Sequence, residues 1–168
     1  MTTITNGAWR LDPDRSSVEF HVRHFYGLMT VKGHFDRYHG TLELNGRPAV
    51  ELVIDADSLD TKHSKRDQHL RSADFFDVAN YRQVRFQSDE ATLAGDTLKV
   101  RGQLHAAGRS IPLDIDATVR EVDGELEVEA SALADHRELG MTWSPLGIMR
   151  APSKLIVRGR LVPKENQS

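Results

Sequence analysis

Apolar and polar residues alternate along most of this chain, and this alternation constrains the fold more than any other feature of the sequence. Residues 16–24 place Val18, Phe20 and Val22 on one side and polar side chains on the other. The same period recurs in seven further segments, at residues 31–44, 50–56, 84–88, 98–104, 111–119, 126–130 and 155–161. A period of two is typical of a β-strand with one buried and one solvated face. The sequence therefore predicts an all-β fold of about eight strands.

One of these segments changes phase along its length. In residues 31–44, Val31 and Phe35 occupy odd positions, whereas Tyr38 and Leu42 occupy even positions. A β-bulge or bend at residues 37–40 would produce this shift by adding one residue to one strand, and it would also curve the sheet.

The connections between the predicted strands are short, with turn sequences such as Asn45-Gly46 and Asp123-Gly124. Short turns join antiparallel neighbours. Eight such strands can form either a two-layer sandwich or a closed barrel, and alternation does not distinguish the two. Small residues at inward positions either leave space or mark bends and close backbone approaches; they are Gly33, Ala56, Gly102, Ala117, Ala130 and Gly159.

One region, residues 60–78, interrupts the strands. Ser64 and Asp67 have the spacing of a capping box, which predicts a short helix that ends at about Arg71. We expect this insertion to cover one end of the sheet. Residues 140–149 (GMTWSPLGIM) are apolar without a strand or helix period. They predict a loop folded over a barrel end, a subunit contact or a ligand portal.

Length and charge restrict the domain count and the partners. The 168 residues fit one domain, with its core at about residues 8–163. The formal net charge of -3 disfavours nucleic acid as a partner, because binding to phosphates needs a basic surface. No segment has the roughly 20 apolar residues of a membrane-spanning helix. Residues 1–9 (MTTITNGAW) lack the pattern of a secretory signal, which favours a soluble, cytoplasmic protein.

The eight histidines raise the question of a metal site. His21 and His24 are separated by an odd number of residues, as are His34 and His39. The members of each pair therefore lie on opposite faces of a strand and cannot share an ion. Only ligands from different strands could form a site, and we expect no bound metal.

Three aspartates, Asp55, Asp57 and Asp60, lie where a predicted strand ends. They could form an acidic site, but aspartates in such places more often hold turns and cap helices. The chain has no cysteine, and no serine lies in a nucleophile-elbow context. No glycine loop of the phosphate-binding kind follows a strand. We therefore expect no catalytic residues, no cofactor and no enzymatic activity.

Several segments together resemble the YceI-like family. Residues 16–24 (SSVEFHVRH) and 31–35 (VKGHF) are similar to its first two strands. The most specific match is residues 55–61 (DADSLDT), followed by residues 66–77 (RDQHLRSADFFD), and residues 137–141 (RELGM) resemble a later signature. The resemblance covers nearly the whole chain. It implies a single eight-stranded antiparallel lipocalin-like β-barrel with one short helical insertion, which encloses a long isoprenoid chain.

Two functions are compatible with such a barrel. The first is non-catalytic binding, storage or transport of a polyisoprenoid or an isoprenoid quinone in the lumen. Its expected ligand-binding residues are the lumen residues Phe20, Val22, Phe35, Leu52, Ile54, Val84 and Phe86, with Phe75, Phe76 and Trp143 nearer the mouth. The second is an interaction module with a solid core, in which residues 140–149 form a subunit or partner surface, as in a homodimer. Binding of fatty-acid-like lipids is a further alternative.

Overall fold

In the computed structural model of this protein, residues 4–24, 29–141 and 149–164 are described. In these ranges, one α-helix, α1 (Ser64–Arg71), and two single 3-10 turns, η1 (Pro13–Arg15) and η2 (Ala56–Ser58), accompany the strands. The strands are β1 (Ala8–Leu11), β2 (Ser17–His24), β3 (Met29–Phe35), β4 (Tyr38–Glu43), β5 (Ala49–Asp55), β6 (Leu59–Asp60), β7 (Gln83–Ala94), β8 (Thr97–Ala106), β9 (Arg109–Val122), β10 (Glu125–Ala134) and β11 (Met149–Pro163).

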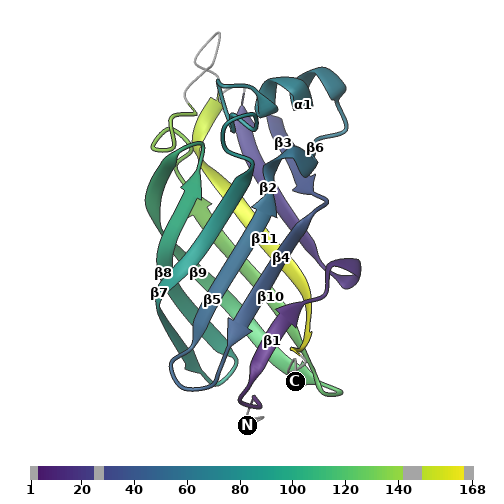
Figure 1. The fold of residues 1–168 in the computed structure, drawn as a ribbon, viewed down its shortest axis with the longest axis vertical. Helices are drawn as coiled ribbons and strands as arrows, with labels where there is room; N and C mark the ends of the chain where they lie inside the picture. The colour runs from purple at the N-terminus through teal and green to yellow at the C-terminus, as the bar shows by residue number, and fades with distance from the viewer. Residues whose placement is uncertain (1–3, 25–28, 142–148, 165–168) are drawn as a thin grey trace.

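These strand segments form a closed antiparallel barrel with eight strand positions (Figure 1). Three positions are each divided into two segments: β1 and β2 by η1, β3 and β4 by a bend, and β5 and β6 by η2. The last strand closes the ring, because β11 pairs with β10 on one side and with both β1 and β2 on the other. The predicted single eight-stranded barrel with one short helix is confirmed.

The predicted change of phase is found between β3 and β4. Asp36 and Arg37 leave the ladder there, and their backbone N–H groups donate instead to the Ser58 hydroxyl, at 3.1 and 2.9 Å. The inward positions consequently change from Gly33 and Phe35 to Gly40 and Leu42, all of them buried. The bend begins one residue before the predicted range of residues 37–40.

Helix α1 lies across one end of the barrel, as expected (Figure 1). The helix ends at Arg71 as predicted, but the predicted capping box is wrong. The N-cap is His63, whose Nδ1 accepts from the backbone N–H of Arg66 at 3.2 Å. The Asp67 carboxylate turns away from the helix and accepts from the backbone N–H of Thr61 at 3.0 Å. The Asp67 carboxylate thus binds the loop before the helix, and the His63 imidazole caps the helix instead.

The small inward residues serve two different purposes. A Cβ added at Gly33 would lie 2.2 Å from Cζ of Phe20, and one at Gly102 would lie 2.3 Å from the carbonyl oxygen of Gln87. These glycines therefore allow a ring or a neighbouring strand to approach closely. Ala117 and Ala130, in contrast, border open space inside the barrel.

The outer face of the barrel carries charged side chains that pair across strands. Arg160 of β11 contacts Glu127 and Glu125 at 3.0 and 3.4 Å, and Arg158 contacts Glu129 at 3.4 Å. Such partly or fully exposed pairs contribute little stability each, but they keep the outward positions polar. Among the described residues, no helix is long and apolar enough to cross a membrane.

Candidate functional site: two apolar chambers inside the barrel

The barrel encloses a cavity at the end that carries α1, and we call this cavity the upper chamber. Its open volume is about 120 Å³. Inward side chains of β2, β3, β5 and β7–β11 form its wall, and Leu70, Phe75 and Phe76, from α1 and the segment after it, also line it. None of the described lining residues is Lys, Arg, Asp or Glu. The chamber is therefore an apolar cavity of the kind that takes up hydrocarbon rather than charged groups.

The structure brings together nearly all of the residues predicted to contact a ligand. Trp143 lies outside the described residues, and contact with a ligand stays a prediction for the whole set. The other nine line the upper chamber, and they are Phe20, Val22, Phe35, Leu52, Ile54, Phe75, Phe76, Val84 and Phe86.

Three aromatic rings meet in the upper chamber. The ring centroids of Phe20 and Phe35 are 5.2 Å apart, and Phe76 lies 6.4 and 5.9 Å from them in edge-on arrangements. Edge-to-face pairs of this kind are favoured by the ring quadrupole. Phe20 and Phe35 belong to strands, whereas Phe76 follows α1, so the cluster joins the helical segment to the barrel wall.

A second open space, the lower chamber, lies toward the β1 end of the barrel. Its open volume is about 100 Å³, and its lining is mostly aliphatic, with residues such as Leu11, Leu42 and Ala117. Five residues line both chambers and form the border between them. These border residues are Leu52, Phe86, Ile115, Ala130 and Val157.

Two buried polar residues of the upper chamber, His136 and Ser153, were not predicted. The imidazole Nδ1 of His136 lies 2.8 Å from Oγ of Ser153, and the two residues are only 6% and 7% exposed. A signal for both was present in the sequence. His136 continues the even-numbered inward series of β10 (Ala130, Ala132, Ala134), and Ser153 begins the odd-numbered inward series of β11.

Burial determines the charge of His136. Loss of solvent lowers the pKa of the imidazole; Asp135 acts to raise it, and Arg137 acts to lower it further. Asp135 and Arg137 pair with each other at 2.9 Å, and the Arg137 side chain is exposed. His136 is therefore neutral near pH 7, and its ring is a hydrogen-bonding group without charge.

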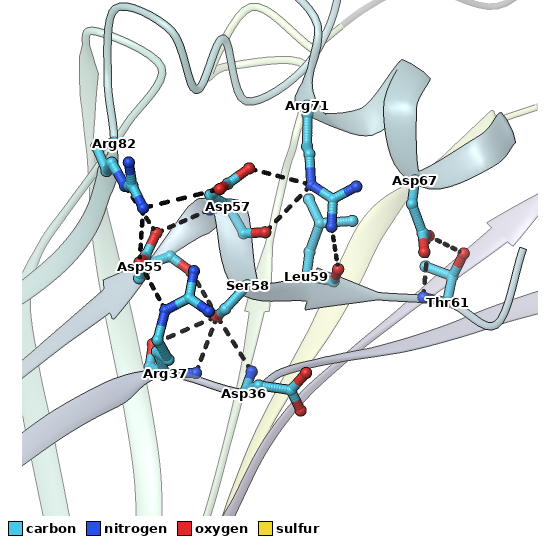
Figure 2. Close-up of polar contacts among 10 residues, drawn as sticks. All are labelled: Asp36, Arg37, Asp55, Asp57, Ser58, Leu59, Thr61, Asp67, Arg71 and Arg82. Carbon is cyan, nitrogen blue, oxygen red and sulfur yellow. Dashed lines mark hydrogen bonds and ion pairs between the residues drawn. The ribbon is translucent and has the colours of Figure 1, made fainter. Parts of the chain in front are cut away.

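A polar network at the rim holds the bend after β3 against η2 (Figure 2). The Asp55 carboxylate accepts from Arg37 at 3.0 Å and from Arg82 at 3.3 Å, and it also accepts from the backbone N–H of Asp57 at 3.0 Å. The Ser58 hydroxyl donates to the carbonyl of Asp55 at 2.7 Å. Burial acts to raise the pKa of Asp55, but these hydrogen bonds hold it below its usual value.

The same network fastens the helical segment to the barrel. Arg71, the last residue of α1, donates to the carbonyls of Asp57 and Leu59 at 3.1 and 2.8 Å, and it contacts the Asp57 carboxylate at 3.3 Å (Figure 2). The Asp60 carboxylate accepts from the backbone N–H of Lys62 at 2.7 Å. The interpretation of these aspartates as residues that hold turns is confirmed, and Phe75 and Phe76 are placed over the chamber as a result.

Within the described part of the chain, one group of possible metal ligands forms across strands, on the outside of the barrel. Ligand atoms of His34, Asp36 and Asp60 lie within 4.8 Å of one another. His34 contacts the Asp36 and Asp60 carboxylates at 3.0 and 3.9 Å, and Lys62 lies 3.6 Å from Asp60. These contacts make a cluster of polar and charged groups at the surface, and it lies apart from both chambers.

Comparison with known proteins decides the family. The family model of the YceI-like domain matches residues 9–158. This chain belongs to the YceI-like family. Protein YceI of Escherichia coli O157:H7 is 36% identical over 104 residues, which cover 60% of this chain and 54% of that protein. A UPF0312 protein of Vibrio cholerae is 35% identical over 107 residues, or 61% of this chain and 56% of that protein. The matched region thus spans about half the length of these curated relatives.

Solved structures share the YceI-like fold. BcnA of Burkholderia cenocepacia superposes with a TM-score of 0.81 at 16% identity, covering 90% of this chain and 99% of that one. A polyisoprenoid binding domain from Saccharophagus degradans superposes with a TM-score of 0.73 at 16% identity, covering 95% and 100%. The YceI protein of Campylobacter jejuni gives 0.70 at 22% identity, covering 82% and 88%. At these identities the likeness concerns the fold alone.

Proposed function

We propose that this YceI-like protein binds a polyisoprenoid or an isoprenoid quinone inside its barrel and catalyses no reaction. The observation that carries the proposal is the upper chamber, whose lining is almost entirely carbon. Each methylene removed from water contributes about 0.8 kcal/mol, so about ten buried carbons contribute roughly 8 kcal/mol. That gain offsets much of the estimated 4–15 kcal/mol that association costs.

The volumes indicate how a long chain is accommodated. A cavity of roughly 150 Å³ lined by Leu, Ile and Phe takes up a molecule of the size of benzene. The chambers measure about 120 and 100 Å³, so neither holds a long isoprenoid by itself. The chain therefore occupies both chambers, and border residues such as Phe86 and Leu52 turn aside to let it pass.

The relatives support the same ligand class. The domain from Saccharophagus degradans with this fold is described as polyisoprenoid binding. The structure offers less support for the alternative of an interaction module with a solid core, because two open apolar spaces lie in the barrel interior. Residues 142–148, which that alternative requires, lie outside the described residues. The homodimer and the cytoplasmic location stay predictions.

A pair of neighbouring residues on β10 allows a controlled test. Ala132 is 8% exposed and lines the upper chamber, whereas Leu133 is 64% exposed on the opposite face. Ala132→Phe fills the chamber with a ring, and Leu133→Phe adds the same ring outside. We expect geranylgeraniol binding to weaken at least roughly tenfold in Ala132→Phe and to stay unchanged in Leu133→Phe, because a filled chamber has no room for the ligand.

Titration calorimetry measures the binding, and circular dichroism checks that each variant is folded. If Ala132→Phe does not fold, Ala132→Leu replaces it. Organic extraction followed by mass spectrometry of the purified wild-type protein gives an independent result. Wild-type protein that yields no apolar ligand and takes up no geranylgeraniol would contradict the proposed function.

A further inference from the structure

The upper chamber contains polar side chains where a site for hydrocarbon alone needs none. Of its described lining residues, three are polar: Ser131, His136 and Ser153. Ser131 is exposed, so His136 and Ser153 are the buried pair. Burying polar groups in an apolar wall is unfavourable unless they make hydrogen bonds. The two side chains make one such hydrogen bond with each other, between Nδ1 of His136 and Oγ of Ser153 at 2.8 Å.

The second ring nitrogen of His136, Nε2, remains available. Among the described residues, it has no hydrogen-bond partner, and the contact with Ser153 is the one hydrogen bond of the His136 side chain there. No fully buried side-chain nitrogen or oxygen lacks a partner in the described part of the chain, so Nε2, which has none, is not fully enclosed by protein atoms. His136 is one of the residues that line the upper chamber. A neutral imidazole whose Nδ1 is engaged with a hydroxyl presents Nε2 as a donor or an acceptor, according to the tautomer.

Hydrogen bonds and strand pairing fix the backbone that carries His136 and Ser153. The His136 carbonyl accepts from the backbone N–H groups of Leu139 and Met141 at 3.2 and 3.1 Å, and both of those side chains line the upper chamber. Ser153 pairs in register with Ala134, the last residue of β10. The turn that follows β10 lies at the same end of the barrel as α1 (Figure 1). The polar pair thus sits at the upper end of the lumen, with the aliphatic lower chamber beyond it.

We infer that His136, oriented by Ser153, hydrogen-bonds an uncharged oxygen of the ligand's head group, so that this protein prefers prenols or isoprenoid quinones to prenyl phosphates and to plain hydrocarbons. This inference rests on the proposed function. The described lining has no Lys or Arg that could balance a phosphate, and an unpaired buried charge is far costlier than a hydroxyl. The head group lies at His136 and the tail extends toward the lower chamber.

Three probes with the same prenyl chain separate these possibilities: farnesol, farnesene and farnesyl phosphate. We expect the wild-type protein to bind farnesol roughly five- to tenfold more tightly than farnesene, since farnesene leaves the buried imidazole without a partner. Farnesyl phosphate is expected to bind at least roughly a hundredfold more weakly than farnesol. His136→Leu should abolish the preference for farnesol and keep farnesene binding, whereas His136→Gln, which retains a hydrogen-bonding group, should keep the preference.

The outer wall provides a matched control, because His105 and Ser110 form an exposed pair of the same kind through Nδ1 and Oγ. His105→Leu should leave the farnesol preference unchanged. If His136→Leu does not fold, Ser153→Ala replaces it and should reduce the preference about threefold, because the ring is no longer oriented. Equal binding of farnesol and farnesene to the wild type, or tightest binding of farnesyl phosphate, would overturn the inference and leave the proposed function standing. Failure of all three probes to bind would contradict the proposed function itself.

Discussion

The two chambers occupy one barrel but are built differently. The upper chamber contains the ring cluster of Phe20, Phe35 and Phe76 and the polar pair of His136 and Ser153. The lower chamber is walled by strands alone and is mostly aliphatic. Segments outside the strands contribute side chains only to the upper one, among the described lining residues. Under the proposed function, this difference assigns recognition of the head group to the upper end and accommodation of the tail to the lower end.

Gly33 and Gly40 lie in the two segments, β3 and β4, of one of the eight barrel strands. Their replacement by alanine gives the largest expected difference in stability between the two ends of the barrel. A Cβ at Gly33, in β3, would lie 2.2 Å from the Phe20 ring, whereas one at Gly40, in β4, would lie 3.3 Å from Cδ1 of Leu52. Gly33→Ala must displace a ring of the aromatic cluster, and we expect it to lower the free energy of unfolding by about 1–3 kcal/mol. Gly40→Ala requires only a small shift of a flexible side chain and should cost less than about 1 kcal/mol.

Urea denaturation of both variants measures this contrast. Equal losses of stability would show that the upper end is no more tightly packed around its rings than the lower end is around its leucines. The two chambers would then not differ in how tightly their walls are packed.

The lower chamber can be tested through the length of the ligand. Ala117 is buried and lines the lower chamber but not the upper one. Ala117→Leu fills space there, and the displacement of about two methylenes of ligand corresponds to roughly 1.6 kcal/mol. Farnesol has fifteen carbons and is too long for the upper chamber alone, so we expect its affinity to fall roughly tenfold, while binding of the five-carbon alcohol prenol stays unchanged. Calorimetry with both alcohols decides the point, and an unchanged affinity for farnesol would mean that its chain does not enter the lower chamber.

The wall of both chambers could be predicted from the sequence because alternation fixes which side chains point inward. Phe20, Leu52 and Phe86 follow that rule directly, and they lie where the pattern places them. The volume could not be predicted in the same way. Whether Gly33 leaves space or admits a ring depends on the rotamer of Phe20 on the neighbouring strand, which no local pattern specifies.

The residues that the sequence reading missed lie where regular structure ends. His136 lies two residues after Ala134, the last residue of β10, so the strand pattern does not reach it, although its position has the right parity. The spacing of Ser64 and Asp67 predicts a capping box, but the Asp67 carboxylate binds Thr61, which lies six residues earlier and outside the helix. A partner outside the helix thus overrides the local signal.

The smallest expected effect is a pH dependence that belongs to the upper chamber. Burial lowers the pKa of His136 from its ordinary value of 6.5, with Asp135 opposing the shift and Arg137 adding to it. The unfolded chain therefore binds a proton at a higher pH than the folded one does. As the pH falls below 6.5 toward the lowered pKa of the folded state, the free energy of unfolding should decrease, and above 6.5 this contribution is fully present.

His136→Gln should remove this part of the pH dependence, which urea denaturation at a series of pH values measures. His21, on the outward face of β2, is a suitable reference, because burial and then Lys32 lower its pKa as well. His21→Gln should remove only its own share and leave the contribution of His136. Asp55 does not interfere, since its lowered pKa places its loss of stability at more acidic pH.

A saturating farnesol concentration sharpens the result. If the ligand's oxygen binds the neutral imidazole, protonation of the folded state becomes harder, and the loss of stability, which still begins near pH 6.5, extends to lower pH in the wild type but not in His136→Gln. A profile identical with and without farnesol would place the head group away from His136 and leave the two chambers distinguished only by their packing.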